Sequence, residues 1–434
     1  MDKPDAGLKT LTEDAGAAVQ KVLAPDIDPR FGAAVTSFTD LGLREELLKG
    51  IFNVMKFERP SKVQSETLPL VLNPPFKNLI AQAHAGSGKT TCFVLTMLSR
   101  ADPAVKEPQA LCSCPTRELA VQNFNVCKKI GTYCTDVSIR LLVPGKEPDG
   151  RMADQIIVGT PGKIAQMWSQ KKYLKFKAMK VLVFDEADNM MDGGFRDTSI
   201  RLVKEVKKAA KGCQILLFSA TFNDVVKEFA LRQIPNASQI FLPREELSLD
   251  IIKQYKVVVP TKEAKATVVK ERIFELADLK SGQSIVFVRT RDNARKMHRD
   301  MEREGHKCTS ITSEMTPEDR DKVIEEFREG KTRILIATDV LSRGFDVSSV
   351  TLVINYDIPV QFGKGTPDYE TYIHRVGRTG RLGKKGAAFN LICGRGEEAQ
   401  MASIEKFYNH QVEAVDWESD EAFEAALAKA NLSS

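Results

Sequence analysis

Short apolar runs rich in β-branched residues alternate with helix-like segments along most of the chain. Such alternation predicts parallel β-sheets whose two faces are both covered by helices. The expected helices include residues 117–130 and 317–328. The expected strands fall into two series, namely residues 79–81, 110–112, 156–158, 181–184 and 215–218, followed by residues 285–288, 309–312, 334–337 and 352–355. Two series of this kind predict two α/β domains in tandem.

A proline-bearing, charged stretch over residues 242–250 separates the two series. Proline and clustered polar residues are typical of a connection between domains. We therefore expect a first domain over residues 34–241, a short linker over 242–250 and a second domain over 251–434. Residues 1–33 have little apolar content and several prolines and glycines, so we expect a mostly disordered N-terminal tail with one short helix near residues 13–23.

The composition excludes several classes of protein. The 434 residues carry a formal net charge of +5, which is compatible with a nucleic-acid partner but does not indicate one. No run of about twenty apolar residues occurs and the N-terminus is charged, so we expect neither a transmembrane helix nor a secretory signal. The eight cysteines are scattered without a C-x-x-C pair, which favours reduced thiols in a cytosolic or nuclear protein over zinc sites or disulfides.

A glycine-rich loop, residues 83–90, lies between the first expected strand and a helical pattern. In this context backbone N–H groups and a helix N-terminus can bind phosphate. The candidate phosphate-binding residues are Gly86, Ser87, Gly88, Lys89 and Thr90. We expect an exposed Lys89 to bind the β- and γ-phosphates and the Thr90 hydroxyl to bind Mg²⁺. The strict pattern begins with glycine where this chain has Ala83, so a simple turn is the alternative for the loop taken alone.

An acidic motif, residues 185–188, directly follows the expected strand 181–184. Asp185 offers the hard oxygen ligand that Mg²⁺ prefers, and Glu186 is placed to orient or deprotonate an attacking water. Taken alone, such a cluster is typical of a solvated strand end. Because ligands of open α/β sheets lie beyond the carboxyl ends of the strands, we expect the glycine loop, the acidic motif and residues 219–221 to converge on one edge.

The second series of strands carries its own polar residues at strand ends, among them Thr338 and Asp346. Residues 374–381 add an arginine–glycine run, which is typical of a flexible basic loop. The alternative is a pair of arginine fingers, Arg378 and Arg381, whose planar guanidinium groups stabilise charge on a transferred phosphoryl group. Since these arginines and the glycine loop lie in different expected domains, hydrolysis would require domain closure.

With these motifs in this order, the chain resembles the DEAD-box RNA helicases over residues 36–425. Residues 57–64 resemble the family's adenine motif, in which Phe57 stacks on the base and Gln64 hydrogen-bonds its edge, which implies ATP rather than GTP. The resemblance implies two tandem RecA-like parallel-sheet domains joined by a short linker. It also implies Arg117, Thr160, Gly162, Arg289 and Thr338 as RNA contacts, Ser219, Thr221, Asp188 and His374 as residues that couple hydrolysis to strand separation, Asp346 as a ribose ligand, and Arg378 and Arg381 as fingers.

The resemblance implies an ATP-dependent RNA helicase, which is an RNA-stimulated ATP hydrolase that uses ATP and Mg²⁺. Hydroxyl, guanidinium and backbone N–H groups that bind the RNA backbone imply sequence-tolerant binding. The implied action is local unwinding of RNA or remodelling of RNA–protein complexes. An ATP-gated RNA clamp uses the same motifs and stays open as an alternative. A third alternative is a nucleotide-binding protein that does not bind RNA. The motifs of the second domain argue against it.

Within the family, residues 217–222, 247–255 and 362–372 resemble the mRNA-export helicases of the cytoplasmic face of the nuclear pore. Residues 81–84 and 90–95 resemble the plant and green-algal version. This resemblance implies a monomer in cytoplasm and nucleus, without membrane insertion, whose partners are RNA and a pore-associated export activator acting with inositol hexakisphosphate. The alternative subfamily is the translation-initiation helicases, in which the segment before the final arginine motif is shorter.

Three positions depart from the family pattern. The family's first RNA motif corresponds to residues 115–120. After it, the pair 144–145, Pro-Gly, replaces the family's glycine pair, which puts an RNA contact there in doubt. Pro317 and Glu318 occupy the region where a glutamine is expected before Arg320. The family's Thr-Pro-Gly-Arg motif corresponds to residues 160–163, where Lys163 replaces the arginine. Lysine keeps the positive charge but lacks the planar guanidinium group.

Overall fold

The chain forms two compact units, Met1–Leu247 (domain 1) and Ser248–Ser434 (domain 2). Each is built on a sheet of mainly parallel strands with helices on both faces, so the expected pair of α/β domains is confirmed. The computed structural model describes residues 19–25, 27–83, 86–145, 148–242, 252–277, 282–339, 347, 349–361, 363–380 and 386–432. Within these residues, no helix is both long enough and apolar enough to cross a membrane.

The described part of domain 1 contains an eight-stranded sheet in the order β1-β8-β2-β7-β6-β3-β5-β4. The strands are β1 Gln20–Val22, β2 Leu79–Gln82, β3 Ala110–Ser113, β4 Ile139–Leu142, β5 Ile156–Gly159, β6 Val181–Phe184, β7 Gln214–Ser219 and β8 Ser238–Phe241. All neighbours pair in parallel except β1 and β8. Every residue of β6 and β7 is buried, which explains why these strands are apolar without alternation.

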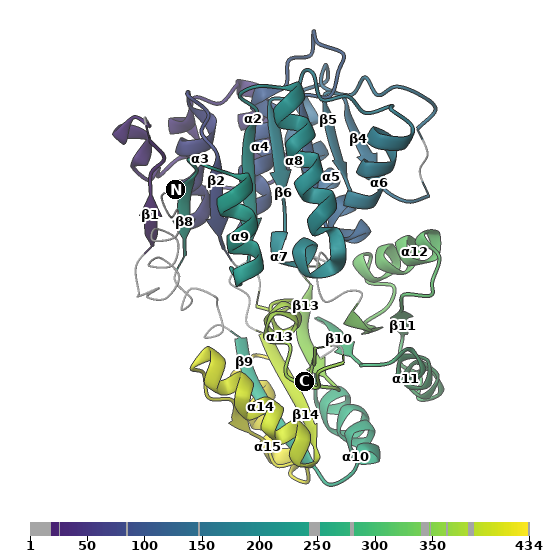
Figure 1. Ribbon diagram of the computed structural model, residues 1–434. Coiled ribbons are helices and arrows are strands. Elements are labelled where there is room, and N and C mark those ends of the chain that lie inside the picture. Colours follow the sequence, from purple (N-terminus) through teal and green to yellow (C-terminus); the bar gives the residue numbers. More distant parts are fainter. Residues whose placement is uncertain are drawn as a thin grey trace. The chain divides into compact units, whose positions relative to one another are not determined.

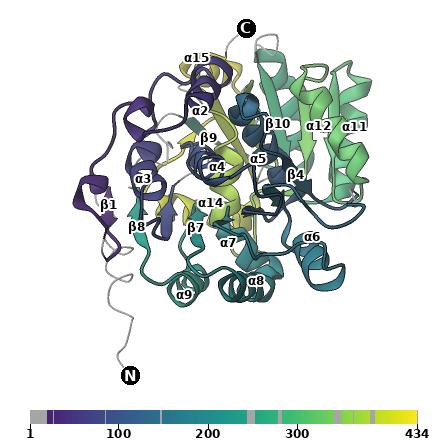
Figure 2. The same ribbon diagram turned by 90° about the horizontal axis from the view of Figure 1, so that it is seen from above.

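The helices of domain 1 cover both faces of this sheet, with α4 on one face and α8 and α9 on the other (Figures 1 and 2). They are α2 Glu45–Lys49, α3 Lys62–Leu72, α4 Lys89–Arg100, α5 Arg117–Ile130, α6 Pro161–Ala165, α7 Ala187–Met190, α8 Arg196–Ala209 and α9 Asp224–Gln233, with shorter 3₁₀ or π turns at η1 Pro29–Gly32, η2 Phe38–Leu41, η3 Gly50–Val54, η4 Gly131–Tyr133, η5 Gln166–Gln170 and η6 Met191–Phe195. Side-chain hydrogen bonds cap the N-termini of several of these helices. Thr116 accepts a hydrogen bond from Leu119 N at 3.2 Å where α5 begins.

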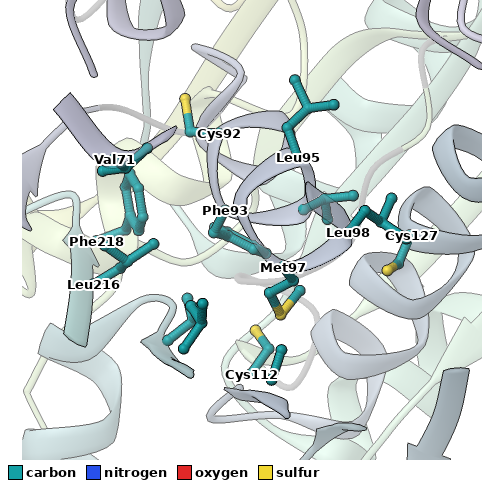
Figure 3. Close-up of a cluster of buried hydrophobic side chains, with 14 of the residues drawn as sticks. Val71, Cys92, Phe93, Leu95, Met97, Leu98, Cys112, Cys127, Leu216 and Phe218 are labelled. Carbon is teal, nitrogen blue, oxygen red and sulfur yellow. The ribbon is translucent and has the colours of Figure 1, made fainter. Parts of the chain in front are cut away.

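The core between α4, α5 and the sheet is drawn in Figure 3. Phe93 of α4 and Phe218 of β7 lie with their ring centroids 5.5 Å apart. Met97 of α4 and Cys112 of β3 belong to the same buried cluster. Because α4 starts directly after the glycine loop, this packing fixes the N-terminus of the helix at the carboxyl edge of the sheet.

The N-terminal segment differs from its expected disorder and helix. Gln20–Val22 forms β1 and pairs antiparallel with β8, so the expected helix near residues 13–23 is wrong over these positions. Ala24 N donates to Ser238 Oγ at 3.0 Å, and Lys21 Nζ donates to Glu66 Oε2 at 2.9 Å. The segment is ordered because β8 offers it free backbone groups at the edge of the sheet, a tertiary feature that composition does not reveal. Residues 1–18 lie outside the described residues.

Domain 2 contains a seven-stranded sheet in its described part, in the order β11-β12-β10-β13-β14-β9-β15, with all neighbours parallel. The strands are β9 Ile252–Val259, β10 Gln283–Phe287, β11 Cys308–Ile311, β12 Ile334–Ala337, β13 Val350–Asn355, β14 Gly386–Cys393 and β15 Glu413–Ala414. The helices are α10 Lys262–Thr267, α11 Arg291–Arg303, α12 Pro317–Arg328, α13 Tyr369–Val376, α14 Gly394–Tyr408 and α15 Asp420–Lys429, with the π-helical η8 Val268–Phe274. One core lies under α11 and α15, and a second lies under α12, α13 and α14.

Several strands were not among those expected, namely β4, β8, β9, β14 and β15. β14 is buried along nearly its whole length, yet its sequence contains glycine, two alanines and an asparagine, which are weak strand formers. β9 contains two lysines and a glutamine among its apolar residues, and it is held by pairing with β14 from Ile252 to Val259. Pairing with distant segments, rather than local propensity, therefore defines these strands.

Candidate functional site

The glycine loop connects β2 to α4 at the carboxyl end of β2. Gly86 and Gly88 have φ values of +82° and +100°, a left-handed backbone that glycine adopts without strain. A Cβ added to Gly88 would also lie 2.4 Å from Gln64 Nε2. The loop therefore requires glycine at both positions, as a close phosphate cradle does. Residues 84 and 85 lie outside the described part of this loop.

Lys89, the first residue of α4, is buried, so the expected exposed ligand is wrong in that respect. Only 8% of the residue is exposed, and its ammonium group donates to the Ala83 carbonyl at 2.6 Å. The side chain is held inward because Ala83, the first residue of the loop, supplies a backbone acceptor close to the start of the helix. The ammonium group is thus held beside the loop, at the helix N-terminus where anions bind.

Gln64 lies in the first turn of α3 and reaches the same loop. Its Oε1 accepts from Ser61 N at 2.9 Å, and its Nε2 donates to Gly88 O at 3.2 Å. Ser61 Oγ donates to Ser87 O at 2.6 Å. The two residues form a capping box that also ties α3 to the glycine loop. Phe57 is half-buried and packs against the core that contains α3 and α4.

Asp185 and Glu186 follow β6 at the same edge of the sheet. Asp185 Oδ1 accepts from Glu186 N at 3.1 Å, and its Oδ2 accepts from Asn123 Nδ2 at 2.8 Å. Burial raises the pKa of Asp185 above its usual value, while the Lys89 charge and the Asn123 hydrogen bond oppose that rise. Glu186 is buried with a φ of +50°, a left-handed conformation that costs energy in a residue other than glycine and is concentrated at functional sites.

Thr90 of α4 is connected to Asp185 through the buried side chain of Asn123. Thr90 Oγ1 lies 3.4 Å from Asn123 Oδ1, on the opposite side of the amide from the carboxylate. A hydroxyl and a carboxylate are hard oxygen ligands of the kind that Mg²⁺ binds while it keeps several waters. The described residues contain no group of three or more histidine, cysteine, aspartate or glutamate side chains that could hold a metal ion.

Asp188, Ser219 and Thr221 form a closed set of hydrogen bonds. Asp188 Oδ2 accepts from Thr221 N at 3.1 Å and from Thr221 Oγ1 at 2.9 Å. Asp188 N donates to Ser219 Oγ at 3.2 Å, and Ser219 Oγ donates to Thr221 O at 2.8 Å. The end of β7 is thus bonded to α7, which begins immediately after Glu186. All three residues are brought together as the sequence predicts.

The candidate RNA contacts of domain 1 follow β3 and β5. Arg117, at the start of α5, is buried and donates from Nη1 to Pro144 O at 2.6 Å. This bond spans from the first RNA motif to the position where the family's glycine pair is replaced. Thr160 precedes α6, and its backbone N donates to Leu142 O at 3.1 Å. Gly162 lies in the first turn of α6, where a Cβ added to it would lie 4.0 Å from the ring of Phe195, an ordinary contact.

The candidate RNA contacts of domain 2 follow β10 and β12. The Arg289 side chain is 45% exposed and donates from Nη2 to Ile358 O at 3.2 Å. Its backbone N donates to Asp357 Oδ2 at 2.7 Å. Thr338 directly follows β12 and is buried. Both residues lie at carboxyl ends of neighbouring strands of the domain 2 sheet.

The arginine–glycine run begins inside α13 rather than in a flexible loop. Arg375 is 1% exposed, and its Nε and Nη2 both donate to Asp339 Oδ1, at 2.9 and 2.6 Å. Its Nη1 donates to Asn355 Oδ1 at 3.2 Å and to Asp357 O at 2.7 Å. The guanidinium carbon lies 5.0 Å from the ring centroid of Phe287. Arg375 therefore joins α13 to three strand ends of domain 2.

The remaining residues of the run are placed only in part. His374 is buried in the last turn of α13, and its carbonyl accepts from Arg378 Nε at 2.9 Å. Arg378 itself lies in the turn after the helix and is buried. The other predicted finger, Arg381, and the predicted ribose ligand, Asp346, lie outside the described residues.

Comparison with known proteins gives the family. The family model described as DEAD/DEAH box helicase matches residues 61–229, and the model described as Helicase conserved C-terminal domain matches residues 264–383. "DEAD-box ATP-dependent RNA helicase 38" of Oryza sativa subsp. japonica is 48% identical over 409 residues, which cover 92% of this chain and 80% of that protein. The chain belongs to the DEAD-box ATP-dependent RNA helicases. The predicted family, and with it an ATP-hydrolysing RNA helicase activity, is confirmed.

Solved structures agree with the fold of this helicase. S. cerevisiae Dbp5 bound to RNA and ADP BeF3 is 38% identical, with a TM-score of 0.85 and coverage of 91% of this chain and 100% of that chain. A Dbp5 variant bound to a Gle1 variant and IP6 is 38% identical, with a TM-score of 0.79 and coverage of 92% and 99%. These likenesses confirm the predicted pair of tandem RecA-like domains.

Two buried residues of this helicase escaped the sequence prediction. Ala120, Asn123 and Cys127 are spaced so that they lie on one face of α5, and all three are buried in domain 1. A polar amide on an apolar helix face was a usable signal, because buried polar groups require partners. Arg375 gave no comparable signal, since its partner Asp339 lies 36 residues earlier in the sequence.

Proposed function

We propose that this helicase binds ATP at the carboxyl edge of the domain 1 sheet and couples its hydrolysis to RNA remodelling in mRNA export. The observation that carries the proposal is the convergence of Lys89, Thr90 and Asp185. Asn123 connects the last two side chains, and the charge of Lys89 acts on the carboxyl group of Asp185. Ligands of open α/β sheets bind at this edge.

In the proposed ATP site, the glycine loop and Lys89 bind the phosphates. The backbone of Gly86, Ser87 and Gly88 lies at the N-terminus of α4, where N–H groups favour negative charge. Thr90 and Asp185 would hold Mg²⁺, which would supply positive charge beside the phosphates. Glu186, next to Asp185, orients the attacking water and accepts its proton.

The adenine base is assigned to Phe57 and Gln64. Gln64 uses one N–H on Gly88 O, which leaves its second N–H and a lone pair on Oε1 for the edge of the base. The half-buried ring of Phe57 has a face that can stack on adenine. Gln64 hydrogen-bonds the glycine loop and would also hydrogen-bond the base. Binding of adenine would therefore directly affect the position of the phosphate-binding loop.

RNA is assigned to Arg117, Thr160 and Gly162 in residues 34–241, the proposed ATP-binding domain, and to Arg289 and Thr338 in residues 251–434. These are groups that bind an RNA backbone rather than base edges, which supports sequence-tolerant binding. The exposed Arg289 side chain can make such a contact without giving up its backbone bond to Asp357.

Coupling is assigned to Asp188, Ser219, Thr221 and His374. In domain 1, the bonds between Asp188 and Thr221 connect the acidic motif to the end of β7, so a change at one reaches the other. From domain 2, Arg378 and Arg381 would stabilise charge on the γ-phosphate, and Asp346 would bind the ribose, once ATP and RNA have closed the two domains. Hydrolysis would then reopen them and release RNA.

We further infer action at the cytoplasmic face of the nuclear pore, as a monomer found in cytoplasm and nucleus. Support comes from S. cerevisiae Dbp5, a variant of which was solved with a Gle1 variant and IP6. By this similarity the partners of the chain are RNA and a Gle1-like export activator acting with inositol hexakisphosphate. The motif resemblance to mRNA-export helicases supports the same assignment.

The test is ATP turnover with and without RNA, measured beside release of a short duplex. We expect turnover to require RNA and to rise further when a Gle1-like activator and inositol hexakisphosphate are added together. Turnover that is indifferent to RNA would contradict the proposal. Stable RNA retention in ATP without duplex release would identify an ATP-gated clamp instead.

A further inference from the structure

Asn123 lies between the two side chains that are proposed to hold Mg²⁺. It is fully buried on α5, whereas Thr90 is on α4 and Asp185 follows β6. Its Nδ2 donates to Asp185 Oδ2 at 2.8 Å, and its Oδ1 lies 3.4 Å from Thr90 Oγ1. Three separate elements thus meet at one amide group, whose two ends face two different oxygen ligands.

We propose that Asn123 is a positioning residue for the Mg²⁺ site of this helicase. The inference rests on the proposed assignment of Thr90 and Asp185 to Mg²⁺. Asn123 does not touch the cation itself. It acts by fixing the orientation of the Thr90 hydroxyl and of the Asp185 carboxylate before Mg²⁺ and ATP arrive.

The polarity of the amide suits this role. A carboxylate can only accept hydrogen bonds, so the NH₂ end of Asn123 must face Asp185 and the carbonyl end must face Thr90. With its proton directed to Asn123 Oδ1, the Thr90 hydroxyl turns its lone pairs toward a cation. Asp185 is held in turn by Asn123 Nδ2 on one oxygen and by Glu186 N on the other, which fixes the plane of the carboxylate.

The position of Asn123 also limits what can replace it. The side chain is enclosed, and its Nδ2 also lies 3.4 Å from Cys114 Sγ in the strand end beneath it. A leucine of similar size can fill this space but offers no hydrogen bond to either ligand. Groups that orient metal ligands in this way typically change metal affinity by about 10- to 100-fold when they are removed.

The experiment compares Asn123→Leu and Asn123→Ala with the unsubstituted chain. The control is Asn125→Leu, which makes the same change at an exposed position of the same helix. Binding of a fluorescent ATP analogue is titrated first in EDTA and then with increasing Mg²⁺, and thermal unfolding is recorded for each protein. The alanine variant covers the case in which leucine prevents folding.

We expect the Asn123 variants to keep their affinity for the analogue in EDTA, while the Mg²⁺ concentration for half-maximal effect rises about tenfold or more. Saturating Mg²⁺ should restore tight binding, and Asn125→Leu should behave as the unsubstituted chain. An unchanged Mg²⁺ requirement would overturn the inference, as would an equal loss of binding with and without Mg²⁺, which would indicate packing alone. Failure of the site assignment is distinguishable, because Thr90→Val would then leave the Mg²⁺ requirement unchanged as well.

Discussion

Thr221 and Asp188 are joined by two hydrogen bonds to a single carboxylate oxygen, from Thr221 N at 3.1 Å and from Thr221 Oγ1 at 2.9 Å. Asp188 is fully buried, and its other carboxylate oxygen accepts a hydrogen bond from Asn189 N at 2.9 Å. The pair connects the helix that follows Glu186 to the loop that follows β7. We therefore propose that a movement of the acidic motif during hydrolysis would be transmitted to residues 219–221.

Replacing Thr221 with valine tests this connection. Thr221→Val keeps the shape of the side chain but removes one of the two donors to Asp188. We expect the free energy of unfolding to fall by about 1.5 to 3 kcal/mol, the usual contribution of a hydrogen bond to a charged group. Duplex release should fall more than ATP turnover, and both are measured on the same preparation. Thr221→Ser, which keeps the hydroxyl, should preserve both; equal loss of both in Thr221→Val would contradict a coupling role.

Gln64→Glu tests the connection between the adenine motif and the glycine loop. Glutamate keeps the acceptor for Ser61 N but loses the donor to Gly88 O. We expect weaker ATP binding and poorer discrimination against GTP, because a site built to hydrogen-bond one base rejects the other through unpaired groups. Competition binding of ATP and GTP measures both effects. If GTP supports equal turnover in the unsubstituted chain, the adenine hypothesis is wrong.

Phe57→Ala separates stacking from edge recognition. The substitution removes the ring but leaves the Gln64 contacts to the glycine loop intact. We expect ATP affinity to fall while the preference for ATP over GTP is largely retained, because both purines can stack. The same competition assay applies. A loss of thermal stability without any loss of nucleotide affinity would assign Phe57 to packing alone.

Lys89→Met tests the phosphate contact at constant packing. Methionine keeps the unbranched stem of the buried side chain and removes the ammonium group that donates to Ala83 O. We expect ATP turnover to be nearly abolished while the fold is retained, as monitored by circular dichroism. Removing the positive charge should also let the pKa of Asp185 rise further, since Lys89 opposes the effect of burial on that group. If the variant hydrolysed ATP as fast as the unsubstituted chain, the proposed role of the glycine loop in hydrolysis would be wrong.

Arg378→Ala and Glu186→Gln should fail in different ways. If Arg378 is a finger, its loss lowers turnover by about 10³- to 10⁵-fold, while ATP binding through Lys89 and Gln64 survives. Glu186→Gln leaves domain closure possible but prevents activation of water, so this variant should stay on RNA with uncleaved ATP. Retention of labelled RNA in ATP is compared for the two. Equal retention, or loss of ATP binding in Arg378→Ala, would sink the finger hypothesis.

Arg375 should behave as a structural residue of domain 2. Arg375→Lys removes the fork that binds Asp339, Asn355 and Asp357 O at once. We expect a loss of about 3 kcal/mol in the free energy of unfolding, at the low end for a broken buried pair because the Asp339 side chain is half-exposed. Denaturant unfolding measures it. Arg295→Lys, at an exposed pair on α11, is the control and should change stability by less than about 1 kcal/mol.

The sequence by itself determined the features that depend on local order. Alternation of apolar runs with helical patterns indicated parallel sheets, since each strand and helix follows from a short window of residues. The glycine loop and the acidic motif each directly follow a strand, so sheet topology alone brings them to one edge. Gly86 and Gly88 have left-handed backbone conformations, which few residues other than glycine adopt, so the glycines themselves mark these positions in the sequence.

Only the tertiary structure decided how these local features meet. Asn123 bridges Thr90 and Asp185, Arg375 joins α13 to Asp339, and β1 is ordered by the edge of β8. Burial of Lys89 likewise depends on the position of the Ala83 carbonyl. Each of these contacts joins groups through space, and in a buried setting its strength depends on distance and on the exclusion of water. A linear sequence states which groups exist, whereas packing decides which of them face one another.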